Sequence, residues 1–194
     1  LAQLRAAATG GSRDWVYLVG PAGSGKTHLA LAVCAAAEQA GRGSAYLPLQ
    51  AAAGRLGDAL EALEGRDVVA LDGLDAIAGQ RGDEVALFDF HNRARAAGVT
   101  LLYTASAAPD ALGLVLPDLR SRLSQCGRIM LDALDDDGRG AVLRERAIRR
   151  GLALDQAAIR FAHGDDAGAE DILLQDLAGS GLHADHDETW RALL

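Results

Sequence analysis

The sequence predicts an α/β fold in which helices flank a five-stranded parallel sheet. Short apolar runs alternate with helix-forming segments along most of the chain, which is the pattern of a doubly wound sheet. One of these runs passes directly into a glycine-rich stretch that opens a helix. The length of 194 residues suits one such domain with a small appendage.

Five apolar runs, each bounded by glycine or polar residues, are the predicted strands. They are residues 15–19, 44–49, 67–72, 99–103 and 128–131. Hydrophobic residues make up 49% of the chain but aromatic residues only 4%. The core between strands and helices must therefore consist mainly of Ala, Leu and Val.

Four segments between the strands have helix-forming composition or helical periodicity. They are residues 26–40, 56–63, 83–97 and 117–123. A glycine follows each of the first three segments and stops the helix. In the third segment we expect Val85, Phe88 and Asn92 to face the core.

The glycine-rich stretch at residues 20–27, GPAGSGKT, fits the pattern G-x-x-x-x-G-K-[ST] of a phosphate-binding loop. Its glycines let backbone N–H groups point at phosphate oxygens, and the following helix aims its positive end at the same place. A glycine-rich turn can match this pattern by chance, but the flanking strand and helix are the context that the motif needs. The expected nucleotide-binding residues are Gly20, Pro21, Ala22, Gly23, Ser24, Gly25, Lys26 and Thr27.

Two side chains of this loop have distinct expected roles. Lys26, the only lysine in the chain, would contact the β- and γ-phosphates as a point charge. The Thr27 hydroxyl would occupy one coordination position on Mg²⁺. The expected ligand is therefore ADP or ATP with Mg²⁺.

A carboxylate ends the third predicted strand. Asp72 can hold the Mg²⁺ through water, opposite Thr27. Many P-loop enzymes place a second acid directly after this aspartate to orient the attacking water, but here the next residue is Gly73. Asp75 lies two residues further on, where we expect it to point elsewhere. We therefore expect weak intrinsic hydrolysis of ATP.

The fourth predicted strand ends near two hydroxyl groups. Thr104 or Ser106 could hydrogen-bond the γ-phosphate or the attacking water. A Ser/Thr turn before Pro109 explains the same residues equally well.

The last third of the chain predicts a helical appendage. Asp135 can cap a helix that runs to Arg150, where a glycine ends it. We therefore divide the chain into a nucleotide-binding core, residues 1–132, and a small helical lid with an acidic tail, residues 133–194. The tail at 183–188 has zinc-ligand residue types, but its spacing fits no familiar structural zinc site and a solvated acidic tail explains it as well.

Charge and composition disfavour several functions. The net charge is −8, and residues 132–194 carry 7 basic and 14 acidic side chains, a net of −7. Without a basic stripe, strong direct DNA binding by this chain is disfavoured. No apolar run has the length of a membrane span, and Cys34 and Cys126 have no metal-ligand spacing, so we expect a cytoplasmic protein with reduced thiols.

Three segments carry a family resemblance: GKTHL at 25–29, LFDFHNR at 87–93 and LGLVLPDLRSRL at 112–123. They resemble AAA+ ATPases of the bacterial replication-initiator (DnaA) clade, and more closely the DnaA-homologous regulators called regulatory inactivators of DnaA (Hda). The first segment is typical of the whole clade and adds His28 to the expected nucleotide-binding residues. The resemblance covers residues 15 to about 155 and implies an AAA+ fold with a small helical lid.

The resemblance gives Arg122 an expected role. In the family, the arginine of the S-R-L/F segment is an arginine finger placed in the nucleotide site of a neighbouring subunit, where it stabilises transferred-phosphate charge. From the residues alone, Arg122 could instead pair with Asp118 on its own helix. The finger implies a regulator of chromosome replication initiation that stimulates ATP hydrolysis by the initiator DnaA in trans.

The resemblance also implies partners. The regulators dock on the DNA polymerase sliding clamp through an N-terminal peptide, which here would precede Leu1. A homo-oligomer is compatible with the same interpretation. Two other functions stay open: a self-sufficient AAA+ ATPase, such as a helicase loader or an initiator core acting on DNA, and a binding module with a degenerate nucleotide site.

The chain departs from the family at two places. The regulators usually continue the fourth strand as D-R-P-P, whereas residues 106–109 are Ser-Ala-Ala-Pro. AAA+ lids commonly supply a second arginine to the nucleotide, but no Lys or Arg lies between Arg160 and Arg191. Either the lid is rebuilt or the nucleotide is held without that arginine.

Overall fold

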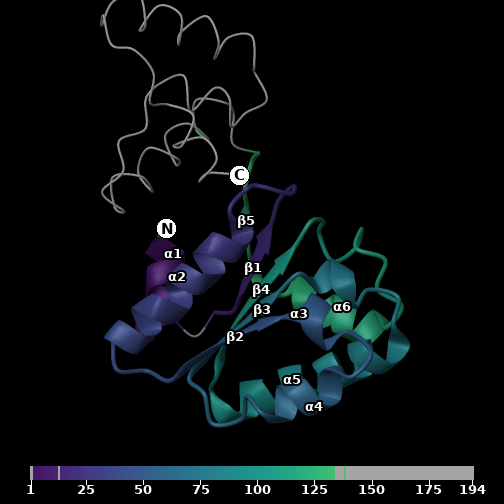
Figure 1. The fold of residues 1–194 in the computed structure, drawn as a ribbon, viewed down its shortest axis with the longest axis horizontal. Helices are drawn as coiled ribbons and strands as arrows, with labels where there is room; N and C mark the ends of the chain where they lie inside the picture. Colours follow the sequence, from purple (N-terminus) through teal and green to yellow (C-terminus); the bar gives the residue numbers. More distant parts are fainter. Residues whose placement is uncertain (1, 13, 134–137, 139–194) are drawn as a thin grey trace, which may run out of the picture. The chain divides into compact units, whose positions relative to one another are not determined.

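A computed structural model describes residues 2–12, 14–133 and 138 of the chain. Its centre is one sheet of five parallel strands in the order β2-β3-β4-β1-β5 (Figure 1). The strands are β1 (Val16–Val19), β2 (Ser44–Pro48), β3 (Val68–Asp72), β4 (Thr100–Ala105) and β5 (Gly127–Met130). The predicted α/β fold class is confirmed, and all five predicted strands lie within about a residue or two of their expected places.

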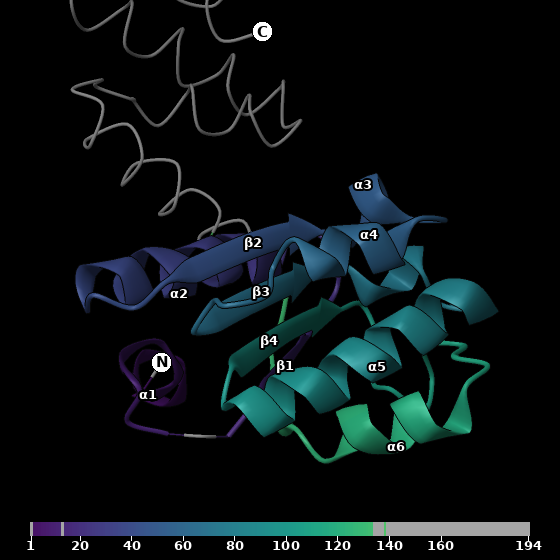
Figure 2. The same cartoon turned by 90° about the horizontal axis from the view of Figure 1, so that it is seen from below.

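Helices cover both faces of the sheet (Figure 2). One face carries α1 (Ala2–Thr9) and α2 (Lys26–Gln39). The other face carries α3 (Leu49–Ala52), α4 (Leu56–Glu61), α5 (Arg81–Ala97) and α6 (Pro117–Ser124), and a short 3₁₀ helix, η1 (Leu74–Ala76), follows β3. We call these the α2 face and the α5 face.

The central strands are buried on both sides, and their side chains alternate between two cores. In β1, Val16 and Leu18 pack in the core of the α2 face, whereas Tyr17 and Val19 pack in the core of the α5 face. This follows from the two-residue period of a strand. Because strands β3 and β4 pair in register with each other, the same alternation decides which side chains meet at their ends.

Helix α1 was not predicted, because a polar cluster follows it and its apolar stripe is short. Three of its side chains, including Leu4, are buried against α2. Arg42 holds its end: Nη1 donates to the carbonyls of Ala7 and Ala8, at 2.8 Å each. A cation at the C-terminal end of a helix is favoured because it satisfies carbonyls that lack intrahelical partners.

The inward face of α5 differs in part from our prediction. Phe88 is partly buried and packs against the core as expected, but Val85 is 39% exposed and Asn92 is only partly buried. The buried residues are instead Asp83, Glu84, Leu87, Phe90, His91 and Ala94. The helix begins at Arg81, and hydrogen bonds from neighbouring loops turn the two acids of its first turn inward.

These two buried acids hold the N-terminal ends of two other helices. The Asp83 carboxylate accepts the N–H groups of Gly54 (2.6 Å) and Leu56 (3.2 Å) at the start of α4. Glu84 is fully buried and accepts three N–H groups, including that of Leu116 (2.7 Å), the residue that caps α6. The orientation of α6 therefore depends on a carboxylate of α5.

Several expectations concern residues outside the described part of the chain. They are the helical lid at 133–194 and the helix 135–150, of which only residues 133 and 138 are described, and also the stretch between Arg160 and Arg191 and the tail 183–188. Within the described residues, none of the helices is long and apolar enough to cross a membrane, and no cluster of three potential metal-ligating side chains occurs.

We predict that Glu84→Gln destabilises the fold by about 2 kcal/mol, because an amide cannot accept all three N–H groups as the carboxylate does. For a chain of this length, the melting temperature should fall by about 4–8 °C. Asp89→Asn, an exposed acid on the same helix, is the matched control and should leave it within about 1 °C. Equal melting temperatures for the two variants in calorimetry would contradict the role assigned to Glu84.

Candidate nucleotide-binding site

The phosphate loop lies at the end of β1, and its three glycines are required for two different reasons. Gly23 and Gly25 have φ angles of 77° and 89°, a left-handed backbone that side chains other than glycine rarely adopt. Gly20 is required by packing: a Cβ there would lie 2.5 Å from the carbonyl oxygen of Leu131, just after β5. The loop therefore sits directly against the chain that leaves the sheet.

Lys26 and the start of α2 give the loop its positive charge. The Lys26 ammonium donates to the carbonyls of Gly20 (2.6 Å) and Pro21 (2.7 Å), which holds it against the loop. Helix α2 begins at this lysine, so its unpaired N–H groups and the positive end of its dipole meet there. The buried hydroxyl of Ser24 has no hydrogen-bond partner among the described residues and is a further donor or acceptor inside the loop.

Asp72, at the end of β3, accepts hydrogen bonds from hydroxyl groups of three other elements. Its Oδ2 accepts the hydroxyls of Thr27 on α2 and Tyr46 on β2, both at 2.8 Å. Its Oδ1 accepts the hydroxyl of Thr104 on β4 at 2.5 Å. The structure therefore brings together three of the predicted residues, Thr27, Asp72 and Thr104.

Strand register explains why these side chains meet. Leu71 pairs with Tyr103, so the next residues, Asp72 and Thr104, lie side by side at the ends of their strands. Both belong to the alternation that points toward the α2 face, where Thr27 begins its helix. Of the two hydroxyl residues predicted near the fourth strand, Thr104 is the one placed at Asp72.

Tyr46 is a residue of this site that we missed. It pairs in register with Ala70, two residues before Asp72, and therefore lies on the same face of the sheet. That relation needs the strand pairing and was not visible in one sequence. Burial, and then the hydrogen bond to Asp72, raise the pKa of Tyr46 to about 12, so its hydroxyl stays protonated and donates to the carboxylate at neutral pH.

The residues after Asp72 do not supply the second acid that many P-loop enzymes place directly after this aspartate. Gly73 has a φ of 84°, and its N–H donates to the Thr104 hydroxyl at 2.9 Å. We expected Asp75 to point elsewhere, and its carboxylate turns to the end of β4, where it accepts the N–H (3.0 Å) and hydroxyl of Ser106. A side chain at position 73 would strain the backbone, so this strand end suits glycine.

The donor set suits Mg²⁺. The Thr27 hydroxyl and the Asp72 carboxylate present oxygen atoms 2.8 Å apart beside the phosphate loop. Mg²⁺ prefers oxygen ligands and usually keeps several of its waters, so one hydroxyl and one carboxylate are sufficient protein contacts. These two residues would hold the ion between the loop and β3.

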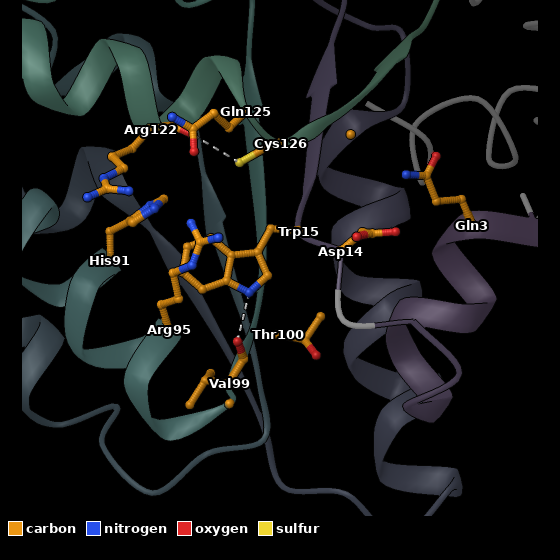
Figure 3. Close-up of a pocket in the computed structure, with 12 residues that line it drawn as sticks. Gln3, Asp14, Trp15, His91, Arg95, Val99, Thr100, Arg122, Gln125 and Cys126 are labelled. Atoms are coloured by element: carbon orange, nitrogen blue, oxygen red, sulfur yellow. Dashed lines mark hydrogen bonds between the residues drawn. The ribbon is translucent and has the colours of Figure 1, made fainter.

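Arg122 does not join this site. It lies on α6 and lines a cavity with Trp15 and Thr100, at the edge of the sheet where the strands begin (Figure 3). The phosphate loop lies at the opposite end of the strands, where they finish. The two ends are separated by the length of β1, about 13 Å for four residues. Its guanidinium forms no ion pair with Asp118 or with any other described residue.

A parallel sheet flanked by helices, with a phosphate loop after β1 and an acid at the end of a neighbouring strand, defines a P-loop NTPase. Residues 16–123 match the sequence profile of the ATPase family associated with various cellular activities (AAA). The chain therefore belongs to the AAA family, and this membership supports nucleotide binding.

Solved structures share the fold. Domain III of the replication initiation protein DnaA from Thermotoga maritima superposes with a TM-score of 0.72 at 21% identity, over 95% of this chain and 85% of that one. AMPPCP-bound DnaA from Aquifex aeolicus gives 0.66 at 20% identity, over 82% of this chain and 54% of that one. DnaI gives 0.55 at 14% identity, over 69% and 80%. The chain thus spans about half the length of the AMPPCP-bound DnaA that it matches.

We predict that Gly73→Glu destabilises the protein, because a left-handed backbone costs a side-chain-bearing residue about 1–2 kcal/mol. The melting temperature should fall by about 4 °C. The matched control is Gly82→Glu in the first turn of α5, where φ is not positive and an added Cβ meets nothing within 4 Å. If the position-73 variant melted no lower than the position-82 variant, the backbone constraint would be wrong.

Proposed function

We propose that this chain is a nucleotide-binding AAA+ regulator that completes the ATP site of another protein with Arg122. It would bind ADP or ATP through residues 20–28, with Mg²⁺ held by Thr27 and Asp72. The observation that carries the proposal is the position of Arg122, which lies at the edge of the sheet opposite its own phosphate loop with no ion pair in the described chain. A guanidinium placed there has no route to its own nucleotide.

The chemistry of the trans step would be electrostatic. When the γ-phosphate of ATP is transferred to water, negative charge spreads over its oxygens, and a guanidinium in contact with them stabilises the transition state. Arg122 is partly exposed on a helix whose start is fixed by buried Glu84, so the side chain is presented from a rigid support. Such a support reduces the entropy lost when the side chain engages a partner.

The proposed partner is the replication initiator DnaA, and the proposed effect is faster ATP hydrolysis by that initiator. The sequence resemblance of residues 87–93 and 112–123 to Hda regulators supports this choice. The same resemblance supports docking on the sliding clamp through an N-terminal segment, and it leaves a homo-oligomer as an additional arrangement. Little direct DNA binding is expected from the acidic charge.

Intrinsic hydrolysis by this chain is proposed to be weak. The position that many P-loop enzymes use for a second acid is Gly73, and the nearby Asp75 is engaged with Ser106. Thr104 contacts Asp72 and Gly73 and could sense the γ-phosphate or orient water, but neither interaction supplies a base.

A second function is favoured by one observation. Thr27, Asp72 and Thr104 form an intact set of contacts beside the phosphate loop, which is what a self-sufficient ATPase such as a helicase loader also needs. The two functions differ in turnover: a loader should hydrolyse ATP when single-stranded DNA is added, whereas the proposed regulator should not.

We predict that Arg122→Ala lowers stimulated ATP hydrolysis by DnaA by at least about 10³-fold, the range seen when an arginine finger is removed. The assay mixes ATP-loaded DnaA, clamp-loaded DNA and this protein, and measures phosphate release. Arg120→Ala on the same helix is the matched control and should retain stimulation. Undiminished stimulation by the Arg122 variant would remove the finger, and DNA-stimulated turnover without DnaA would favour the loader.

We also predict that Lys26→Ala weakens ADP and ATP binding by at least about tenfold, because it removes a charged donor from the phosphates. Calorimetric titration measures this directly. Arg93→Ala, an exposed residue on α5, should bind both nucleotides as the unaltered protein does. If neither nucleotide binds the unaltered protein, the site is degenerate and the chain is an interaction module.

A further inference from the structure

A cavity of about 640 Å³ lies at the edge of the sheet where the strands begin. Figure 3 shows its lining, which comes from segments far apart in the sequence. The residues that matter here are Trp15, before β1; His91 and Arg95, on α5; and Arg122, on α6. The cavity is separate from the phosphate loop, which lies at the opposite edge of the sheet.

The charge of this cavity is positive and unbalanced. Within the described residues, the guanidinium groups of Arg95 and Arg122 form neither an ion pair nor a hydrogen bond. The one carboxylate in the lining is Asp14, which accepts a hydrogen bond from Ser12 at 3.1 Å. It lies across the cavity from the two arginines, beyond Trp15 (Figure 3).

His91 adds an unsatisfied polar atom to the same wall. Its side chain is 1% exposed, and its Nδ1 lies 3.0 Å from the Tyr103 hydroxyl, but its Nε2 has no hydrogen-bond partner among the described residues. Most buried polar atoms in proteins have a partner, so an orphan ring nitrogen calls for an explanation. Figure 3 shows this ring and the Arg122 guanidinium side by side at the cavity.

His91 stays neutral, so the positive charge belongs to the arginines. Burial, and then the positive charges of Arg122 and Arg95, lower the pKa of His91 to about 4. Both arginines line the same cavity as this ring. Trp15 completes the wall: its indole meets the His91 ring edge-on, with centroids 4.3 Å apart, and donates to the Val99 carbonyl at 2.9 Å.

We propose that this cavity binds a small molecule that carries a phosphate group, with the phosphate between Arg95 and Arg122. Guanidinium groups present fixed forks of N–H donors that match phosphate oxygens, and a phosphate dianion balances two of them. The volume exceeds that of a free phosphate and lies within the range of small-molecule sites, so the rest of the ligand would lie against the Trp15 indole.

This site goes beyond the proposed regulatory function and does not depend on it. Binding would engage the Arg122 guanidinium whether or not that group ever meets a partner's nucleotide. If Arg122 does act in trans, a molecule bound in the cavity competes for the same side chain and lowers stimulation.

The test uses inorganic pyrophosphate as the probe and Trp15 as the reporter. Trp190→Phe removes the second tryptophan of the chain, so the fluorescence change comes from the cavity. We expect a saturable change, matched in calorimetry, that survives Lys26→Ala. Arg95→Gln and Arg122→Gln should each weaken it at least about tenfold. Arg93→Gln, from the same helix, is the matched control because Arg93 pairs with Glu64 at 3.2 Å and does not line the cavity.

Three results would overturn the proposal. The first is no saturable binding by either method. The second is binding that Lys26→Ala abolishes, which would assign it to the phosphate loop, or that both glutamine variants retain. The third is equally tight binding of malonate, which would replace phosphate by a dicarboxylate. None of these measurements contains DnaA, so their failure leaves the trans role of Arg122 to its own assay.

Discussion

One carboxylate organises the nucleotide side of this molecule. Asp72 accepts hydroxyl groups from α2, β2 and β4 while it ends β3 itself, so four elements converge on two oxygen atoms. Each hydroxyl has a fixed direction because its backbone belongs to a helix or to a strand of the sheet. The carboxylate is thus held in one orientation next to the phosphate loop, which is the condition for a metal site with few protein ligands.

A feature could be predicted from the sequence when the residues that form it are neighbours in the chain, and could not when they are far apart in the chain. The five strands depend on neighbours in the chain, and the predicted fold class was right. The phosphate-loop motif is equally local, and its nucleotide contacts stay a prediction. Tyr46 reaches Asp72 only through the pairing of β2 with β3, so a single sequence held no signal for it. The inward face of α5 was misjudged because Val85 is more apolar than Glu84, yet Glu84 is buried by the N–H groups of loops far away in the sequence.

Buried Glu84 also links the two helices that extend to the other end of the sheet. Glu84 on α5 fixes the start of α6, and α5 also carries His91 and Arg95 to the cavity that Arg122 lines. Two of the helices that line the cavity therefore share a buried electrostatic anchor. Burial of an acid is expensive unless it is fully hydrogen-bonded, and here three N–H groups satisfy it.

The phosphate loop lies at one end of β1 and the arginine cavity lies near the other end. A partner that contacts the loop and a partner that contacts the cavity would therefore bind two different surfaces of this molecule. If Arg122 acts in trans as proposed, the contact between the cavity end of one molecule and the loop end of another is head-to-tail. A two-fold dimer buries the same surface on both molecules and is complete. A head-to-tail pair instead leaves the arginine of one molecule and the phosphate loop of the other without a partner. The contact alone sets no upper limit on the number of molecules, so the size of such an assembly would be decided by ring closure or by a terminal partner that lacks one of the two surfaces.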